Sequence, residues 1–297
     1  MAGNQTKLEA YIAEELKRYV GKYIPLKSGL LRRIIVRNSA CERLHPNPND
    51  EFCDPEIGPN YEIISKYEKD IKRIKDSPVK EKMFDSSLIV ERMYPDGYML
   101  LNGHHRWAAA MQMGVKRVPV HITNPTRADD IQKMLKKARH NKRVTLDLDE
   151  VIFVYDAQEK AEKELCFPFN RFYRARLRSG VPALFHYLKT SGYDIWVYTD
   201  RYFSLEHIRH YFKLYHARVD GIVTGTAGKS RADADERKKL QAQFAVQYPV
   251  TLNIDLRSVV RVDEKAHNYQ QYDLTGNADT WSREVMEIVG AIEKNEE

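Results

Sequence analysis

Apolar positions in the first 138 residues alternate between the helical period and the strand period. Residues 8–23 carry apolar side chains every three or four positions, which predicts one amphipathic helix that docks on a protein surface. The turn Tyr94-Pro-Asp-Gly97 separates two strand-like runs and predicts a hairpin, because proline fixes one φ and glycine accepts a positive φ. Residues 44–59, rich in proline, asparagine and acid, predict a long irregular loop. The other expected elements are strands at 30–36 and 117–122 and helices at 61–74, 107–113 and 126–138.

The second half alternates short apolar runs with amphipathic helices. Strands are expected at 144–148, 194–198 and 251–255, and helices at 181–190, 205–214, 231–243 and 279–292. Such alternation predicts an α/β unit in which helices cover both faces of a parallel sheet. The polar stretch His140-Asn-Lys-Arg143 separates the halves. We therefore expect a first domain of mixed α+β type over 1–140 and a second, doubly wound domain over 141–297.

Polar side chains stand at the end of each apolar run in the second half. Asp147 and Asp149 end the first run, Thr199 follows the second, and Asp255 ends the third. Ligands of open α/β sheets bind at the carboxyl ends of the strands. Two carboxylates this close repel each other unless a cation lies between them or one stays protonated, and Mg²⁺ prefers carboxylate oxygens. For the Asp-x-Asp tripeptide alone, a solvated turn is the favoured interpretation.

The order Asp-x-Asp, Thr, Lys, Asp over these segments resembles the haloacid dehalogenase superfamily of phosphohydrolases, from about Lys142 onward. The resemblance implies a Rossmann-like fold and assigns roles to the residues. Asp147 is the nucleophile that forms an aspartyl-phosphate, Asp149 the general acid and base, Thr199 a phosphoryl hydrogen-bond donor, and Lys229 the neutralising cation. Asp147, the backbone carbonyl of Asp149, and Asp255 hold Mg²⁺. The alternatives left open are Lys238 or Lys239 for the lysine, and Asp263 as a replacement for Asp255 or as an additional ligand beside it.

Two features depart from this superfamily pattern. Val151 stands where the most similar members, with an Asp-Leu-Asp-Glu-Thr signature, have threonine. Residues 156–178 look helical and aromatic, yet they are too few for a large cap domain. We therefore expect little or no cap. An open site suits a bulky substrate, or the N-terminal domain caps the site. The aromatic residues 167–173 could stack on bases, although side chains at this spacing are more often core or interface.

A second candidate site lies in the first half, where Asn102-Gly-His-His-Arg106 joins a strand to a helix. The first N–H groups of a helix and its dipole attract anions, and Arg106 can donate two hydrogen bonds to a phosphate. His104 and His105 can donate as well. An asparagine-capped helix whose first turn faces water explains the same residues equally well.

Residues 30–125 resemble the ParB/sulfiredoxin-like superfamily, whose turn of this type binds a nucleotide phosphate. The stretch Gly103-His-His-Arg106 is similar to the kinase-like version of that turn. Sulfiredoxin chemistry requires a cysteine that this turn lacks, and the helix-turn-helix segments that follow many ParB-type domains are missing. The resemblance implies a nucleotide ligand, ATP or another nucleoside triphosphate.

Composition narrows the class of protein. The net charge is +6, which agrees with an anionic substrate without requiring one. Three cysteines without Cys-x-x-Cys spacing, no apolar run of membrane length and no signal peptide predict a cytoplasmic protein without a membrane partner. The stretch Gly225-Thr-Ala-Gly-Lys-Ser230 looks like a phosphate loop, but Val223 stands where its spacing requires glycine, so we reject it.

Three functions agree with these patterns. The first is a Mg²⁺-dependent phosphohydrolase, acting on a phosphorylated small molecule or a nucleic-acid end, joined to a nucleotide-binding domain. The second adds an N-terminal kinase or nuclease activity, with Glu51, Asp54 or Glu56 from the long loop as the base of the kinase. The third is a regulatory or nucleic-acid-binding protein with inert sites. The sequence does not determine the physiological substrate or the oligomeric state.

Overall fold

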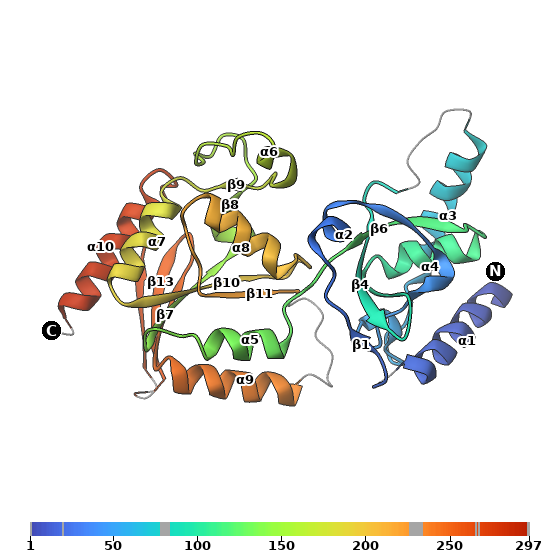
Figure 1. The fold of residues 1–297 in the computed structure, drawn as a ribbon, viewed down its shortest axis with the longest axis horizontal. Helices are drawn as coiled ribbons and strands as arrows, with labels where there is room; N and C mark the ends of the chain where they lie inside the picture. Colours follow the sequence, from blue (N-terminus) through green and yellow to red (C-terminus); the bar gives the residue numbers. More distant parts are fainter. Residues whose placement is uncertain are drawn as a thin grey trace. The chain divides into compact units, whose positions relative to one another are not determined.

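A computed structural model of the chain describes residues 2–19, 21–77, 84–225, 234–264, 266 and 268–295. The protein is mixed α/β, with parallel and antiparallel strand pairs in its sheets (Figure 1). Contacts divide it into two compact units, one ending at Asn124 and the next beginning at Pro125. The boundary expected near residue 140 lies later than this division, because α5 (Ala128–Leu135) buries Ile131, Met134 and Leu135 in the core of the second unit. Across the described residues, no helix is long and apolar enough to cross a membrane.

The first unit is built on a sheet of order β2-β6-β4-β5-β3, with β1 paired to β4. The hairpin β4–β5 is antiparallel, whereas β6 runs parallel to β4. The strands are β1 Ile24–Pro25, β2 Arg37–Ala40, β3 Leu44–His45, β4 Leu88–Tyr94, β5 Tyr98–Asn102 and β6 Arg117–Ile122. The helices are α1 Ala2–Tyr19, α2 Leu30–Ile34, α3 Tyr61–Asp76 and α4 His104–Gln112, with short 3-10 turns at Cys41–Arg43 and Glu51–Cys53.

Periodicity predicted most of this unit correctly, and the strand expected over 30–36 is wrong. The hairpin, β6 and the helices α3 and α4 are confirmed within a few residues. Residues 30–34 form α2 instead of a strand, and Leu31 in α2 is 74% exposed. A short apolar run is consistent with a buried strand, but its periodicity alone does not distinguish a strand from a helix. Helix α4 supplies the core, where Trp107, Ala108 and Ala109 are fully buried.

The second unit contains a sheet of order β11-β10-β7-β12-β13-β14. The first four strands are parallel, and β13 and β14 add antiparallel pairs that the sequence did not predict. The strands are β7 Lys142–Asp147, β10 Tyr193–Thr199, β11 Gly221–Thr224, β12 Val250–Ile254, β13 Ser258–Asp263 and β14 Asn268–Asp273, with a separate pair β8 Phe153–Val154 and β9 Arg176–Leu177. The helices are α5, α6 Phe169–Phe172, α7 Val181–Thr190, α8 Leu205–Leu214, α9 Ala234–Gln247 and α10 Trp281–Lys294.

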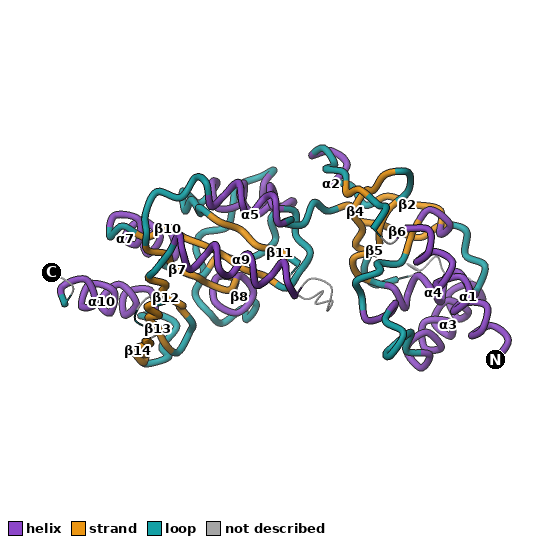
Figure 2. Tube along the Cα trace, turned by 90° about the horizontal axis from the view of Figure 1, so that it is seen from below, coloured by secondary structure: helices purple, strands orange, loops and turns teal. Residues whose placement is uncertain are grey.

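Helices cover both faces of this sheet, as the alternating pattern predicted. Helices α7, α8 and α10 lie above the sheet in Figure 1, and α5 and α9 lie below it. Seen from below in Figure 2, α9 lies in front of β7 and β10. Residues 156–178 were expected to be helical, which is wrong, because most of them form an irregular excursion between β8 and β9 that holds only the short helix α6.

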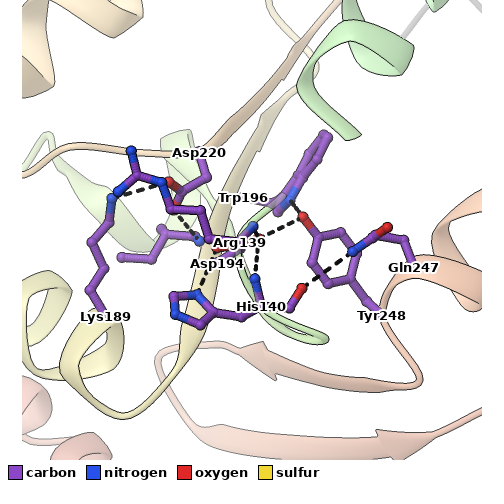
Figure 3. A network of polar contacts seen from close by, with 9 residues as sticks. Arg139, His140, Lys189, Asp194, Trp196, Asp220, Gln247 and Tyr248 are labelled. Atoms are coloured by element: carbon purple, nitrogen blue, oxygen red, sulfur yellow. Dashed lines mark hydrogen bonds and ion pairs between the residues drawn. The ribbon is translucent and has the colours of Figure 1, made fainter. Parts of the chain in front are cut away.

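A buried carboxylate fixes the amino-terminal edge of β10 (Figure 3). Asp194 is 1% exposed, and its carboxylate contacts His140 Nδ1 at 2.9 Å and accepts hydrogen bonds from the Arg139 N–H and the Tyr248 hydroxyl, both at 3.0 Å. Burial raises the pKa of Tyr248, so its hydroxyl stays a donor. This network joins the segment before β7 to the end of α9. It therefore holds the sheet from the edge opposite to Asp147.

Candidate functional site

The parallel strands of the second unit place Asp147 and Asp255 at one edge of the sheet. Across the sheet the parallel strands lie in the order β11, β10, β7, β12, whereas along the chain β7 comes first and β12 last. The direction in which strands are added therefore reverses between β7 and β12. Ligands of open α/β sheets bind at this type of switch point. Asp147 ends β7, and Asp255 directly follows Ile254, which pairs with Leu146. Two carboxylates thus follow neighbouring strands at the switch point.

Asp147 is oriented by the turn that follows it. Its Oδ1 accepts hydrogen bonds from the backbone N–H groups of Asp149 at 2.7 Å and Glu150 at 2.8 Å. Residues Leu148–Ile152 form a π-helical turn, a form that often occurs at functional sites. Among the described residues, Oδ2 has no hydrogen-bond partner. One oxygen of Asp147 is therefore held in place, and the other can meet a ligand.

Three donors surround the carboxylate of Asp149. Thr199 Oγ1 donates to Oδ2 at 2.5 Å, while the Tyr155 hydroxyl at 2.6 Å and Arg201 Nε at 3.2 Å contact Oδ1. The resemblance assigned Thr199 to the phosphoryl group, and in this structure its hydroxyl orients Asp149. Burial, and then the hydrogen bond to Asp149, raise the pKa of Tyr155, so this hydroxyl remains a donor.

Sequence reasoning missed Tyr155 and Arg201. Arg201 stands two residues after Thr199, at the end of a strand where charged residues meet ligands, and that position was the available signal. Tyr155 lies after the π-helical turn, which sequence periodicity did not predict. Tyr155 therefore became recognisable only through its contact with Asp149.

The alternative residues proposed for the metal and the cation are placed differently. Asp263 pairs with Val250, at the opposite end of β12 from Asp255, so it cannot replace Asp255. Lys229 and the rejected phosphate-loop stretch from residue 226 to residue 230 lie outside the described residues. Lys238 and Lys239 are exposed on α9. Within the described residues, no three His, Cys, Asp or Glu side chains form a group that could hold a metal ion.

The first unit contains a cavity of about 480 Å³ at the start of α4. Its lining residues are Asp50, Ile63, Tyr67, Asp85, Ser86, Leu101 and Asn102 together with the turn Gly103, His104, His105 and Arg106. Gly103 has a φ of +101°, and a Cβ there would lie 2.5 Å from Leu88 Cδ2. The turn therefore needs glycine. The structure brings all four predicted phosphate-binding residues to this cavity, where the first N–H groups of α4 lack helical acceptors.

The two histidines of the turn have different roles. His104 is 4% exposed, its Nε2 accepts the Asn47 N–H at 3.2 Å, and its Nδ1 lies 3.5 Å from Asp50 Oδ2. Burial lowers its pKa to about 4, so the ring is neutral and both of its nitrogens are used within the protein. His105 Nε2 accepts the Asn60 N–H at 3.1 Å, which leaves the proton on Nδ1. His105 can therefore donate to a ligand, whereas His104 holds the loop.

Arg106 is fixed by its neighbours. Nη1 donates to the carbonyl and hydroxyl oxygens of Ser86 at 2.7 and 2.6 Å, and Nη2 donates to Asn102 Oδ1 at 3.2 Å. Burial lowers the pKa of Arg106 below its usual range. The acidic residues proposed as a kinase base, Glu51, Asp54 and Glu56, are not among the lining residues of the cavity, where Asp50 lies instead.

Comparison with known proteins bears on the first half of the chain. Residues 62–138 match the model of the ParB N-terminal domain, which confirms the ParB-like part of the resemblance over that range. A similar solved structure is that of the C-terminally truncated chromosome-partitioning protein ParB from Caulobacter crescentus, complexed with CTP-γ-S. The identity is 24% over 36% of this chain, with a TM-score of 0.25. The chain covers 56% of that ParB chain. No curated protein matches the sequence. The haloacid dehalogenase resemblance of residues 141–297 stays a prediction.

Proposed function

We propose that the protein is a Mg²⁺-dependent phosphohydrolase for phosphomonoesters, with an N-terminal unit that binds a nucleotide. The observation that carries the first part is the pairing of β7 with β12 at the switch point of the sheet, which brings Asp147 and Asp255 to one edge. The donors around Asp149 support the same assignment, because they hold a second carboxylate beside the first.

The residues at this edge fit Mg²⁺. This ion takes one or two protein carboxylates and keeps waters and substrate phosphates as its other ligands, so it needs no complete protein cage. Asp147, Asp255 and the backbone carbonyl of Asp149 would hold it. When bound, Mg²⁺ supplies positive charge that offsets the phosphate and the neighbouring acids.

Two displacements complete the proposed reaction. A carboxylate oxygen of Asp147 attacks phosphorus, the bond to the ester oxygen breaks, and Asp149 gives its proton to the leaving alcohol. A water molecule then loses a proton to Asp149 and attacks the aspartyl-phosphate, which releases phosphate and restores Asp147. Thr199, Tyr155 and Arg201 orient Asp149 for both proton transfers.

The substitution Asp147→Asn tests this mechanism. Asparagine keeps the size of the side chain and an oxygen that accepts the N–H groups of Asp149 and Glu150, but it removes the nucleophile and one metal charge. We expect it to abolish Mg²⁺-dependent phosphate release from an aryl phosphate, as a chelator would for the wild type. Asp263→Asn, at the opposite edge of the sheet, is the matched control and should keep full activity. Wild-type rates from Asp147→Asn would contradict the proposal.

The cavity at the start of α4 supports nucleotide binding by the first unit. A volume of about 480 Å³ suits a ligand of nucleotide size. The N–H groups of the first turn of α4 and the Nδ1–H of His105 offer donors for phosphate oxygens. The match to the ParB N-terminal domain covers α3, the hairpin β4–β5 and α4, which border the cavity.

Calorimetry with ATP, CTP and ADP tests this part. Arg106→Ala should weaken binding by more than His104→Ala, because its guanidinium fixes Asn102 and Ser86 around the turn and presents a positive charge. Arg117→Ala, an exposed arginine on β6, is the control and should bind as the wild type does. Absence of binding for all three nucleotides at millimolar concentration would reject the cavity as a nucleotide site.

A second candidate function is phosphoryl transfer from the nucleotide in this cavity. The observation that favours it is the carboxylate of Asp50, which lines the cavity together with the first turn of α4. A general base must lie within reach of the proton that it removes. Nucleotide consumption by the Asp147→Asn protein, lost again on Asp50→Asn, would support this activity. An Asp147→Asn protein that consumes no nucleotide would exclude it.

A further inference from the structure

The excursion between β8 and β9 exposes an unusual number of aromatic rings. Phe167 is 71% exposed, Tyr155 58%, Phe172 46% and Phe169 37%. In the described chain only Tyr94 and Tyr269 are further aromatic side chains of this exposure. Figure 1 shows the excursion with α6 above α8, away from the sheet. Exposed apolar groups that gather in one segment mark a binding surface.

Positively charged side chains accompany these rings. The guanidinium of Arg171 lies 5.3 Å from the ring centre of Phe167, and that of Arg201 lies 5.1 Å from the ring centre of Tyr155. His210 packs against Phe169 with ring centres 5.9 Å apart.

Three of the four acidic side chains of the excursion accept hydrogen bonds, and the fourth, Glu164, is exposed. Glu159 accepts a hydrogen bond from Arg178 at 2.7 Å, Glu162 accepts one from the Gly180 N–H at 2.7 Å, and Asp156 accepts the Gln158 N–H at 2.9 Å. The outer surface therefore carries aromatic faces and arginines together with the exposed carboxylate of Glu164. Proteins that bind single-stranded nucleic acids without sequence preference combine aromatic faces and positive charges, with bases stacked on rings and cations beside the backbone.

The excursion is attached to the Asp147 site at two points. At one point, Tyr155 donates its hydroxyl to Asp149 at 2.6 Å. At the other, the ring of Tyr173 stacks on His207 of α8 at 4.5 Å, and Tyr211 of α8 donates to the Ala175 carbonyl at 3.0 Å. Helix α8 begins at Leu205, soon after Arg201 at the end of β10. The excursion is thus tied through Tyr155 to the carboxylates that we assign to phosphate chemistry.

We propose that this excursion is a stacking platform for single-stranded nucleic acid, and that the substrate of the Asp147 site is a strand with a terminal phosphate. This inference rests on the proposed phosphohydrolase function. The platform consists of Tyr155, Phe167, Phe169, Arg171 and Phe172. A phosphate at Asp147 would leave the adjoining bases beside these rings, whereas a small sugar phosphate would use none of them.

A protein partner is the competing occupant, because protein interfaces also favour aromatic rings and arginine. The contact of Tyr155 with Asp149 favours nucleic acid, since it ties the platform to the carboxylates assigned to phosphate chemistry. Leu165, an aliphatic residue of the excursion, is packed against the core of the second unit. The first unit offers the contrast, because its exposed stretch around α2 has aliphatic residues such as Leu31 and Val36 and no aromatic ring. Rings paired with cations suit base stacking and phosphate contact together, whereas the stretch around α2 combines arginines with aliphatic side chains only.

Photocrosslinking locates the bound strand. Full-length Asp147→Asn protein, which should bind without turnover, is mixed with an oligonucleotide of about ten thymidines that carries 5-iodouracil and a 3′- or 5′-phosphate. Light couples iodouracil to neighbouring aromatic rings, and mass spectrometry identifies the peptide. We expect the crosslink in the peptides that contain Phe167 and Phe172. Crosslinks confined to the first unit would overturn the proposal. A platform that binds a protein and no oligonucleotide would overturn it as well.

Kinetics then measure what the platform contributes. The double variant Phe167→Ala/Phe172→Ala should raise KM for phosphate release from the oligonucleotide by roughly tenfold or more, since it removes two rings and each stacked base contributes about fivefold or more in affinity. Its turnover of an aryl phosphate should be unchanged. Tyr269→Ala removes a ring that is 74% exposed on β14 and is the matched control. An unchanged KM in the double variant would overturn the platform alone. Failure of the phosphohydrolase would appear separately, as no release from either substrate by the wild type.

Discussion

Acidification is expected to weaken the first unit through His104. This side chain is buried, stacks on Phe52 with ring centres 5.4 Å apart, and uses both ring nitrogens within the protein. Burial lowers its pKa from 6.5 to about 4, with partial compensation by the Asp50 carboxylate. The unfolded chain therefore takes up a proton near pH 6.5, and the folded unit does so only near pH 4. The contribution of neutral His104 to the stability of the first unit is fully present above pH 6.5, and it is lost as the pH falls from there toward 4.

The size of the loss follows from the gap between the two pKa values. At pH 5 the unfolded histidine is almost fully protonated and the folded one is mostly neutral. Integration over the gap gives about 2 kcal/mol less stability at pH 5 than at pH 7. His104 forms the first turn of α4, so the same loss loosens the cavity and weakens nucleotide binding.

Hydrogen exchange of the α4 amides at pH 7 and pH 5, corrected for intrinsic rates, reports on this unit by itself. We expect protection to fall by roughly 30-fold, which corresponds to about 2 kcal/mol. His104→Gln keeps an acceptor for the Asn47 N–H and cannot take up a proton, so it should lack this loss. His186→Gln changes an exposed histidine on α7 and should retain it. Equal losses in the wild type and in His104→Gln would refute the reasoning.

Three further predictions concern single contacts. Gly103→Ala should remove nucleotide binding, because its Cβ would clash with neighbouring side chains, whereas Gly114→Ala has open space and should cost only about 1 kcal/mol of backbone strain, as calorimetry and urea unfolding can measure. Asp194→Ala should destabilise the second unit by about 3 kcal/mol in urea unfolding, because it leaves buried donors without an acceptor, and it should not change nucleotide affinity. Tyr155→Phe should lower kcat for an aryl phosphate without changing the unfolding midpoint, since it removes one donor to Asp149 and little volume.

Local periodicity determined the elements of this protein and the residues at their ends. The apolar run before Asp147, the proline and glycine of the hairpin turn, and the glycine before α4 act over a few residues. Their effects can therefore be read without the fold. The turn from Gly103 to Arg106 is also local, so the sequence alone predicted its four residues as one site. The structure brings these residues to one cavity.

Only the tertiary structure decided which strands are neighbours. The strand neighbours in turn distinguish Asp255 from Asp263. Asp255 and Asp263 look equivalent in sequence, since each ends an apolar run. Because β13 returns antiparallel to β12, Asp263 lies at the far edge, and only Asp255 follows the strand beside Asp147. Strand direction depends on long-range pairing, which periodicity does not contain.

The same limit applies to side chains that meet from distant segments. Thr199 and Arg201 reach Asp149 from β10 and its following loop, so their contacts exist only once β10 lies beside β7. The apolar run at 30–36 has the composition of a strand, yet its apolar side chains stay exposed, and part of it forms the helix α2. Composition and period describe what a segment can bury. The packing of the whole chain determines whether there is anything to bury it against.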